Sequence, residues 1–205
     1  IKIKKINKNT ICIFNPVTLE NNETSSLNTQ TILCVARYSI EHKGLDYLIE
    51  IASKLPTNWK IKLVGSGNAA EREEVMRLVE NWDAQNKIEL CGNLHGDELK
   101  KCYKESSIYL MTSRWEGFPL VLAEAMSFGL PVVAFEQTGS KQVLQNGEFG
   151  IIIEQGKIDR MLESLIDLIE DPEKLKELSA LSLNRVEEFQ INKILNQWKD
   201  LLNQS

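Results

Sequence analysis

The strongest constraint on the fold of this chain is a series of short apolar runs that alternate with stretches of helical periodicity. The runs predict six buried strands, at Thr31–Ala36, Trp59–Val64, Lys87–Cys91, Ile108–Met111, Pro131–Phe135 and Phe149–Ile153. Strands that alternate with helices in this way are typical of a parallel sheet that is covered on both faces. The sequence therefore predicts a three-layer α/β fold, with the parallel sheet between two layers of helices.

Helices are expected between and after these strands. The periodicity places them at Gly44–Leu55, Glu71–Asn81, Gly96–Lys104, Ser140–Gln145, Asp159–Glu170, Pro172–Phe189 and Ile191–Leu202, besides a central helix described below. Before the first strand, the alternation of Ile and Lys in Ile1–Lys8 and the run Thr10–Phe14 predict extended structure or an edge strand. The polar stretch Thr18–Asn28 has no apolar periodicity and is interpreted as a linker or flexible loop.

Length and composition favour one soluble domain. The 205 residues suffice for a sizeable core, and 42% are hydrophobic and 26% charged. The net charge is −5 and there is no strongly basic block, which argues against nucleic acid as a partner. No apolar run approaches the length of about 18 residues that a transmembrane helix needs. The chain begins at Ile1 without a signal-peptide pattern or a starting Met, which favours a piece of a longer protein.

The four cysteines predict neither a metal site nor a disulfide. They stand at positions 12, 34, 91 and 102 and form no C-x-x-C pair. Cys34 and Cys91 lie in predicted strands, where Cys behaves as a small hydrophobe. We expect reduced, structural cysteines and a cytoplasmic protein.

The stretch SRWEGFPLVLAEAM, residues 113–126, combines a glycine turn with the start of a helix. Gly117 loosens the turn, and Pro119 has the φ that suits a first helical position. We therefore predict a central helix that runs from Phe118 or Pro119 to Phe128.

This helix start is a candidate anion site. The amides of Leu120 and Val121 are among its free N–H groups, and the helix dipole adds about half a positive charge. Two carboxylates flank the site, Glu116 in the loop and Glu124 eight positions later in the helix. A buried carboxylate without a partner costs several kcal/mol, so Glu124 either reaches solvent or accepts hydrogen bonds. Ligand hydroxyls are natural candidates for that partner.

Other candidate groups follow the predicted strands, at the edge where ligands of parallel sheets bind. Arg37 follows the first strand, with Lys43 six residues later; two cations there suit a diphosphate, although both could be solvated surface groups. The turn Gly65–Ala70 fits G-x-G-x-x-A, but the acid that a dinucleotide site needs would be Glu89, in mid-strand. Trp115 suits either packing or the stacking of a sugar.

The segment Glu116–Ala134, EGFPLVLAEAMSFGLPVVA, resembles the E-x7-E signature of retaining glycosyltransferases of the GT-B fold, glycosyltransferase family 4 type. The resemblance extends from about Ile11 to about Leu202. It implies the C-terminal half of a GT-B enzyme, which is a Rossmann-like domain. Residues 1–28 would be an interdomain connection, 29–190 the nucleotide-sugar-binding domain and 191–205 the C-terminal crossover helix.

The resemblance also implies roles for single residues. Arg37 and Lys43 match the cations that hold the donor diphosphate, Glu116 the acid that contacts the donor sugar, and Glu124 the acid that binds the ribose. The implied catalytic residues are Glu116, Arg37 and Lys43. The implied donor-binding residues are Arg37, Lys43, Gly65, Leu94, Glu116, Gly117, Phe118, Leu120, Val121 and Glu124. Pro119 departs from the family, which often has Gly there. The family generally works without a metal or cofactor.

The activity that the resemblance implies is a retaining transfer of a hexose from a nucleotide sugar, UDP-linked, to a saccharide or lipid-linked acceptor. The setting would be bacterial surface polysaccharide synthesis, in the cytoplasm or at the inner face of the membrane. The acceptor would require a second domain in front of Ile1, so the chain alone would bind donor and transfer nothing. The alternatives are a non-catalytic nucleotide-binding domain, an NAD-dependent oxidoreductase that uses Gly65–Ala70, and a sugar-nucleotide epimerase of GT-B fold.

Overall fold

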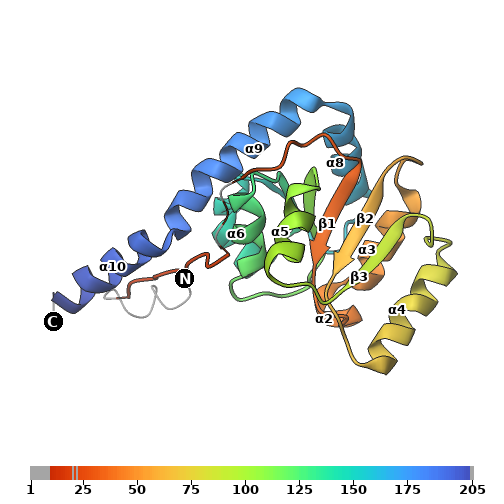
Figure 1. Ribbon diagram of the computed structural model, residues 1–205, viewed down its shortest axis with the longest axis horizontal. Helices are drawn as coiled ribbons and strands as arrows, with labels where there is room; N and C mark the ends of the chain where they lie inside the picture. The colour runs from red at the N-terminus through yellow and green to blue at the C-terminus, as the bar shows by residue number, and fades with distance from the viewer. Residues whose placement is uncertain (1–9, 20, 22, 204–205) are drawn as a thin grey trace.

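A six-stranded parallel sheet forms the centre of the structure, a computed structural model that describes residues 10–19, 21 and 23–203 (Figure 1). Its strands are β1 (Thr31–Val35), β2 (Lys60–Val64), β3 (Ile88–Gly92), β4 (Ile108–Met111), β5 (Val132–Phe135) and β6 (Ile151–Ile153). They lie in the order β3-β2-β1-β4-β5-β6, and all neighbours are parallel. The predicted parallel α/β fold is confirmed, and each strand was placed to within two residues at either end.

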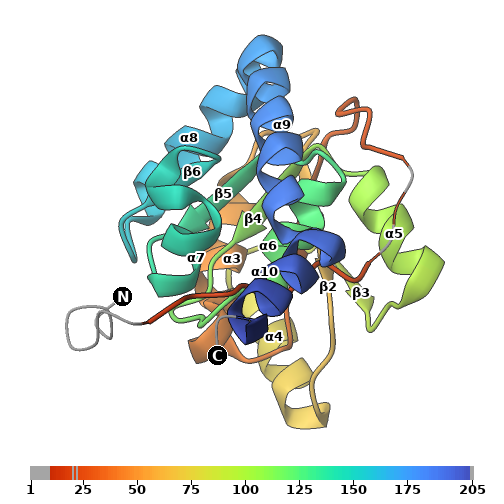
Figure 2. The same ribbon diagram turned by 90° about the vertical axis from the view of Figure 1, so that its left-hand side faces the viewer.

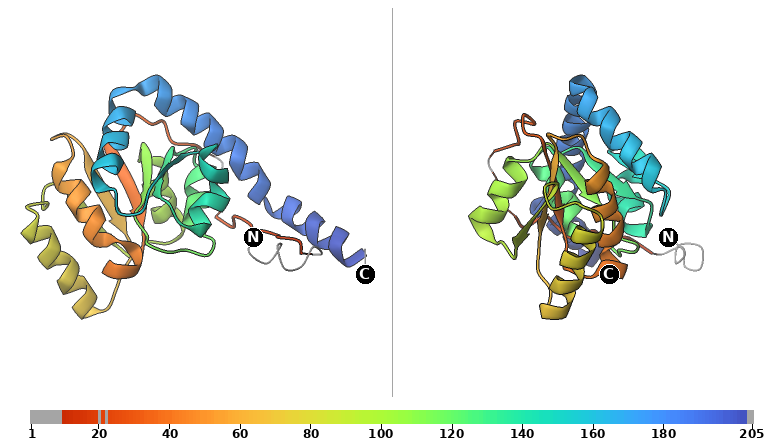
Figure 3. Two further views of the ribbon diagram at one scale, coloured as in Figure 1. Left: turned by 180° about the vertical axis from the view of Figure 1, so that it is seen from behind. Right: turned by 90° about the vertical axis from the view of Figure 1, so that its right-hand side faces the viewer.

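Helices cover both faces of this sheet. They are α2 (Ile40–Lys43), α3 (Leu45–Lys54), α4 (Ala69–Asn81), α5 (Gly96–Lys104), α6 (Leu120–Ser127), α7 (Thr138–Val143), α8 (Ile158–Glu170), α9 (Pro172–Val186) and α10 (Ile191–Asn203). Because side chains of a strand alternate, the fully buried Ile32 and Leu33 belong to two hydrophobic clusters on opposite faces. Residues of α3, α4 and α8 complete the first cluster, and α3 and α8 lie in front of the sheet in the left view of Figure 3. Residues of α5 and α6 and the end of α9 complete the second.

Most helix boundaries agree with those predicted to within two residues, and two of the differences are informative. The central helix α6 begins at Leu120, and Pro119 is its N-cap in an extended conformation with φ −79° and ψ 96°. A proline suits this place because the cap need not donate a hydrogen bond and its ring fixes φ. At the C-terminus, the helix predicted to run to Phe189 ends at Val186 and continues as a single 3₁₀ turn, Glu187–Phe189. The four-residue helix α2 was not predicted, because one turn is too short to show a period.

The edge strand that was one prediction for Thr10–Phe14 is wrong. These residues form no strand, whereas Ile1–Lys8 lies outside the described residues. Phe14 instead stacks on Phe118 at 5.4 Å and meets the edge of Phe189 at 5.5 Å, and the Val17 amide donates to the Phe189 carbonyl at 2.9 Å. Aromatic packing therefore holds this segment beside the start of α10 and away from the sheet (Figures 1 and 2).

Gly44 allows the turn after β1 to touch the chain after β4. It has the left-handed φ of 62° between α2 and α3, and a Cβ added there would lie 2.1 Å from the carbonyl oxygen of Thr112. No side chain fits this space, so the close approach requires glycine.

We expect Gly44→Ala to destabilise the fold by about 1–3 kcal/mol, because the left-handed φ and the overlap with Thr112 both strain the backbone. Urea unfolding measures the effect. The control is Gly117→Ala, where an added Cβ meets no atom within 4 Å, with an expected change of at most about 0.5 kcal/mol. Equal unfolding midpoints for the two variants would contradict this reading of the turn.

Candidate functional site

A cleft of about 470 Å³ lies at the carboxyl ends of β1, β2 and β4. The sheet order reverses between β1 and β4, and ligands of open α/β sheets bind at such a switch point. The cleft is lined by Val35, Ala36, Arg37, Lys43, Val64, Gly65, Ser66, Asn93, Glu116, Phe118, Pro119, Leu120 and Val121. Seven of the residues singled out in the sequence therefore meet here, whereas Leu94, Gly117 and Glu124 do not line the cleft.

The β1 side of the cleft carries the exposed side chain of Arg37. The structure gives its guanidinium no acidic partner within the described part of the chain. Next to it, Gly65 has a φ of 144°, and a Cβ there would lie 2.0 Å from the Ala36 carbonyl oxygen. The chains leaving β1 and β2 are thus in contact, and the floor of the cleft is backbone.

On the β4 side, Lys43 and Glu116 form an ion pair inside the cleft. The Lys43 Nζ and Glu116 Oε1 atoms are 2.5 Å apart, and the two side chains are only 16% and 15% exposed. The two groups come from different elements, the end of α2 and the loop after β4. Both are placed to face a ligand.

The N-terminus of α6 closes the cleft. No side chain caps it, and the first amides of a helix, here those of Leu120 and Val121, have no intrahelical acceptor. The dipole of the helix places a partial positive charge at this end. Together with Arg37 and Lys43, these amides make the cleft suited to an anion with several oxygens.

A network around Arg114 fastens the loop after β4 to the turn after β1. The guanidinium donates to both carboxylate oxygens of Asp46, at 2.9 and 2.6 Å, and lies 4.0 Å from the centre of the Tyr47 ring. Its hydrogen bond to Asp46 raises the pKa of Arg114. The Arg114 amide donates to the His42 carbonyl at 2.9 Å, and the Thr112 hydroxyl donates to the Lys43 carbonyl at 3.0 Å. The cleft residues are therefore held by partners outside the cleft.

Trp115 packs on a neighbouring ring, which is one of the two roles that the sequence left open. One face of its ring stacks on His42, with centroids 5.2 Å apart and an angle of 14° between the planes. The side chain is nevertheless half exposed.

Glu124 has a protein partner that the sequence did not reveal. The hydroxyl of the buried Tyr103, in α5, donates to Glu124 Oε2 at 2.9 Å. Burial raises the pKa of Glu124, and this hydrogen bond opposes the rise. The expected partner, a ligand hydroxyl, is thus not needed to satisfy the carboxylate. Only the apolar environment of Glu124 in the sequence hinted that a donor from another element was required.

The structure also shows where the residues after β2 and β3 lie. Asn93 reaches the cleft, whereas Leu94 packs partly buried against the second hydrophobic cluster. Glu89, the acid that a dinucleotide site would use, lies in β3 and pairs with Lys60 at 2.8 Å. Gly65–Ala70 therefore serves as the turn into α4, whose N-cap Asn68 exchanges hydrogen bonds with Glu71.

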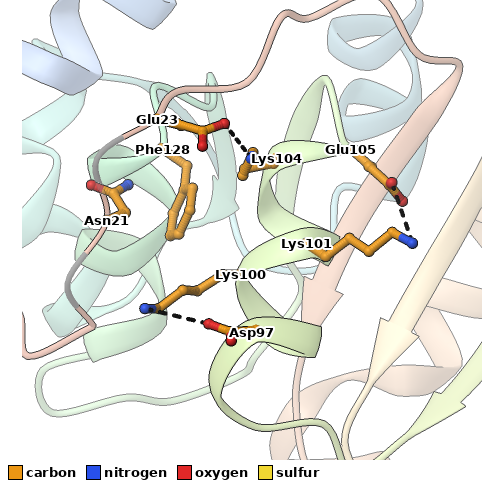
Figure 4. Close-up of a pocket in the computed structure, with 8 residues that line it drawn as sticks. All are labelled: Asn21, Glu23, Asp97, Lys100, Lys101, Lys104, Glu105 and Phe128. Carbon is orange, nitrogen blue, oxygen red and sulfur yellow. Dashed lines mark hydrogen bonds and ion pairs between the residues drawn. The ribbon is translucent and has the colours of Figure 1, made fainter.

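A larger cavity of about 590 Å³ lies elsewhere, between α5 and the segment before β1 (Figure 4). Three lysines line it, and each faces an acid. The pairs are Lys104 with Glu23, Lys101 with Glu105 at 3.8 Å, and Lys100 with Asp97 at 3.8 Å. This cavity lies away from the switch point of the sheet, where the residues predicted from the sequence meet, and it is therefore not our candidate site.

Two features are absent from the described part of the chain. No three His, Cys, Asp or Glu side chains there are grouped so that they could ligate a metal ion. No described helix combines the length and the apolar character that crossing a membrane demands.

Comparison with protein families gives a match over most of the chain. The model of the family described as "Glycosyl transferases group 1" matches residues 18–182. The chain is 38% identical over 200 residues to an uncharacterized glycosyltransferase of Haemophilus influenzae, covering 95% of the chain and 55% of that relative. It is 32% identical to the GtfA subunit of the UDP-N-acetylglucosamine–peptide N-acetylglucosaminyltransferase of Streptococcus parasanguinis, covering 82% of the chain and 34% of that protein. The chain thus spans about half the length of these relatives or less.

Solved structures share the fold. A TarM mutant of S. aureus, in complex with fondaparinux, alpha-GlcNAc-glycerol and UDP, superposes with a TM-score of 0.82 at 23% identity, covering 98% of this chain and 42% of TarM. The apo form of the lipopolysaccharide outer core galactosyltransferase WaaB superposes with a TM-score of 0.80 at 19% identity, covering 100% of this chain and 59% of WaaB. At these identities the comparison establishes the three-layer α/β fold.

We expect Tyr103→Phe to destabilise the protein more at neutral than at acidic pH. The pKa of Glu124 is higher in the folded than in the unfolded protein, so protonation of Glu124 favours folding. This contribution to the free energy of unfolding is complete below the usual pKa of 4.5, and it is lost as the pH rises through the raised pKa of the folded state. Loss of the hydroxyl raises this pKa further, so the variant should lose about 1–3 kcal/mol near pH 7.5 and less near pH 4 in urea unfolding. In a Glu124→Gln background the cost of Tyr103→Phe should no longer depend on pH. If Tyr103→Phe lowers the free energy of unfolding equally at both pH values in the wild-type background, the Tyr103 hydroxyl does not stabilise the charged form of Glu124.

Proposed function

The chain belongs to the glycosyl transferases group 1 family, and from that premise we propose that it is the C-terminal, donor-binding half of a retaining GT-B glycosyltransferase of family 4 type. The donor is a nucleotide sugar, UDP-linked, and the enzyme transfers a hexose. One observation carries the proposal: Arg37, Lys43 and the N-terminus of α6 converge on one cleft at the switch point of the sheet. The UDP in the TarM complex and in the name of the streptococcal relative supports the choice of nucleotide.

The diphosphate occupies the space between Arg37 and the first amides of α6, where it receives two kinds of positive charge. The sugar extends toward Glu116, which accepts hydrogen bonds from its hydroxyls. Glu124 lies farther along α6, outside the lining of the cleft, so the nucleoside extends beyond the cleft to reach it; its Oε1, which Tyr103 does not contact, accepts from the ribose. Positive side chains and amides stabilise the leaving group, and the proposal requires no metal or cofactor.

In the transfer, the bond between the anomeric carbon and the β-phosphate oxygen breaks and its electron pair stays on the phosphate. An acceptor hydroxyl bonds to the anomeric carbon on the face that the diphosphate leaves, so the configuration is retained. The hydroxyl proton passes to the leaving phosphate. Arg37 and Lys43 favour this step by attracting the charge that develops on the diphosphate.

The acceptor, a saccharide or lipid-linked saccharide of bacterial surface polysaccharide synthesis, binds to a second domain that precedes residue 1. An apolar stripe on α10 supports such a domain, because Ile191, Leu195, Trp198 and Leu202 are 49%, 48%, 48% and 68% exposed at helical spacing. In this proposal, residues 1–28 connect the two domains, and residues 191–205 return from this domain to the N-terminal one. The whole enzyme works in the cytoplasm, at the inner face of the membrane, and this chain alone binds donor without transferring it.

We expect the chain to bind UDP and Arg37→Ala to weaken that binding about tenfold or more, because the variant loses a charge-assisted hydrogen bond to the diphosphate. Titration calorimetry measures both affinities. Arg160→Ala, which removes an exposed arginine of α8 that does not line the cleft, is the control and should change the affinity by less than about twofold. Absence of heat with the wild-type chain, or equal heat with Arg37→Ala, would count against the proposed site.

A further inference from the structure

The ion pair between Lys43 and Glu116 has a consequence for the proposed donor site, on which this inference rests. Both side chains line the cleft, and they bind each other at 2.5 Å. Lys43, which would bind the diphosphate, is therefore already paired with Glu116, which would bind the sugar. A ligand that takes one of the two groups must also satisfy the other.

We propose that Glu116 and the diphosphate compete for Lys43, so that the cleft holds a sugar-bearing donor more tightly than the nucleoside diphosphate that remains after transfer. The ion pair then favours dissociation of the nucleoside diphosphate after the transfer and favours binding of the intact donor.

The low exposure of the pair gives the competition its strength. At 16% and 15% exposure, neither side chain is freely solvated, so parting them leaves a carboxylate that water compensates only in part. That carboxylate would also face the negative phosphates. A bare nucleoside diphosphate offers Glu116 no donor in return, and its binding therefore carries the whole cost.

A sugar on the β-phosphate changes this balance. Its hydroxyls donate hydrogen bonds to Glu116 while Lys43 moves to the phosphate, so both members of the pair are satisfied. When the sugar leaves, those donors leave with it, and the Glu116 carboxylate again lacks a partner. Glu116 then recovers Lys43, and the diphosphate loses one of its two cations.

The backbones on both sides fix this geometry. The Lys43 carbonyl accepts from the Thr112 hydroxyl at 3.0 Å, and the Glu116 carbonyl accepts from the Gly139 amide at 3.1 Å. An exchange of partners between Lys43 and Glu116 therefore needs only side-chain rotation, with both backbones anchored. Arg37, which has no acidic partner in the part of the chain that the structure describes, is outside the competition and keeps its hold on either ligand.

The test is calorimetry of the 205-residue chain with UDP and with UDP-glucose or UDP-N-acetylglucosamine, whichever binds the wild type more tightly. Glu116→Gln keeps the shape and removes the charge, and it should bind UDP about five- to tenfold more tightly than the wild type. Its preference for the UDP-sugar over UDP should shrink. Glu136→Gln is the matched control, since Glu136 also pairs with a lysine, Lys141, at 2.5 Å but does not line the cleft.

A second background shows whether Lys43 is the object of the competition. In Lys43→Gln, the gain from Glu116→Gln should vanish, because no cation is left to release. A gain that persists in that background, or one that Glu136→Gln reproduces, would mean general charge repulsion and would overturn the inference. Unchanged or weaker UDP binding by Glu116→Gln would overturn it too, with the proposed function intact as long as the wild type binds UDP. If the wild type binds no UDP, both proposals fail.

Discussion

The cleft depends on one contact, between the turn that follows β1 and the loop that follows β4. β1 and β4 are parallel neighbours, so their carboxyl ends emerge side by side at the place where the strand order reverses. Gly44 lets the two chains touch at Thr112, and Arg114 locks them through Asp46 and Tyr47. Without this junction, Lys43 and Glu116 would belong to two independent loops. With it, groups 73 positions apart in sequence meet as one ion pair.

The two acids of the central stretch are given different surroundings by this arrangement. Glu116 forms an ion pair with Lys43 within the cleft. Glu124 lies on α6, among apolar residues, and its hydrogen bond comes from the rigidly buried Tyr103. Burial raises its pKa, and the phenol restrains that rise. One carboxylate is therefore suited to a contact that changes during a reaction, and the other to a permanent contact.

The pattern of apolar residues was sufficient to predict the layers, the strands and the place of the cleft, because strands buried on both faces of a parallel sheet consist of continuous apolar residues. It could not predict pairings between distant elements. Tyr103 and Arg114 each find their partner across the fold, and nothing in their local sequence names Glu124 or Asp46. The helix start was misplaced at Pro119 for a related reason: proline suits both the cap and the first helical position, and only the loop geometry decides between them.

An acidic chain with a net charge of −5 can still attract an anion, because charge acts locally when salt screens it over about 8–10 Å. Arg37 is exposed and has no acidic partner in the described residues, so its positive charge is not compensated locally. The amides of α6 add a positive potential that no side chain neutralises. Lys43 differs from both, since its charge is available only when Glu116 releases it. In the proposed site, Arg37 and the α6 amides are therefore always available to an anion, whereas Lys43 is available only when Glu116 gains another partner. This difference would let the cleft distinguish between anions of similar charge.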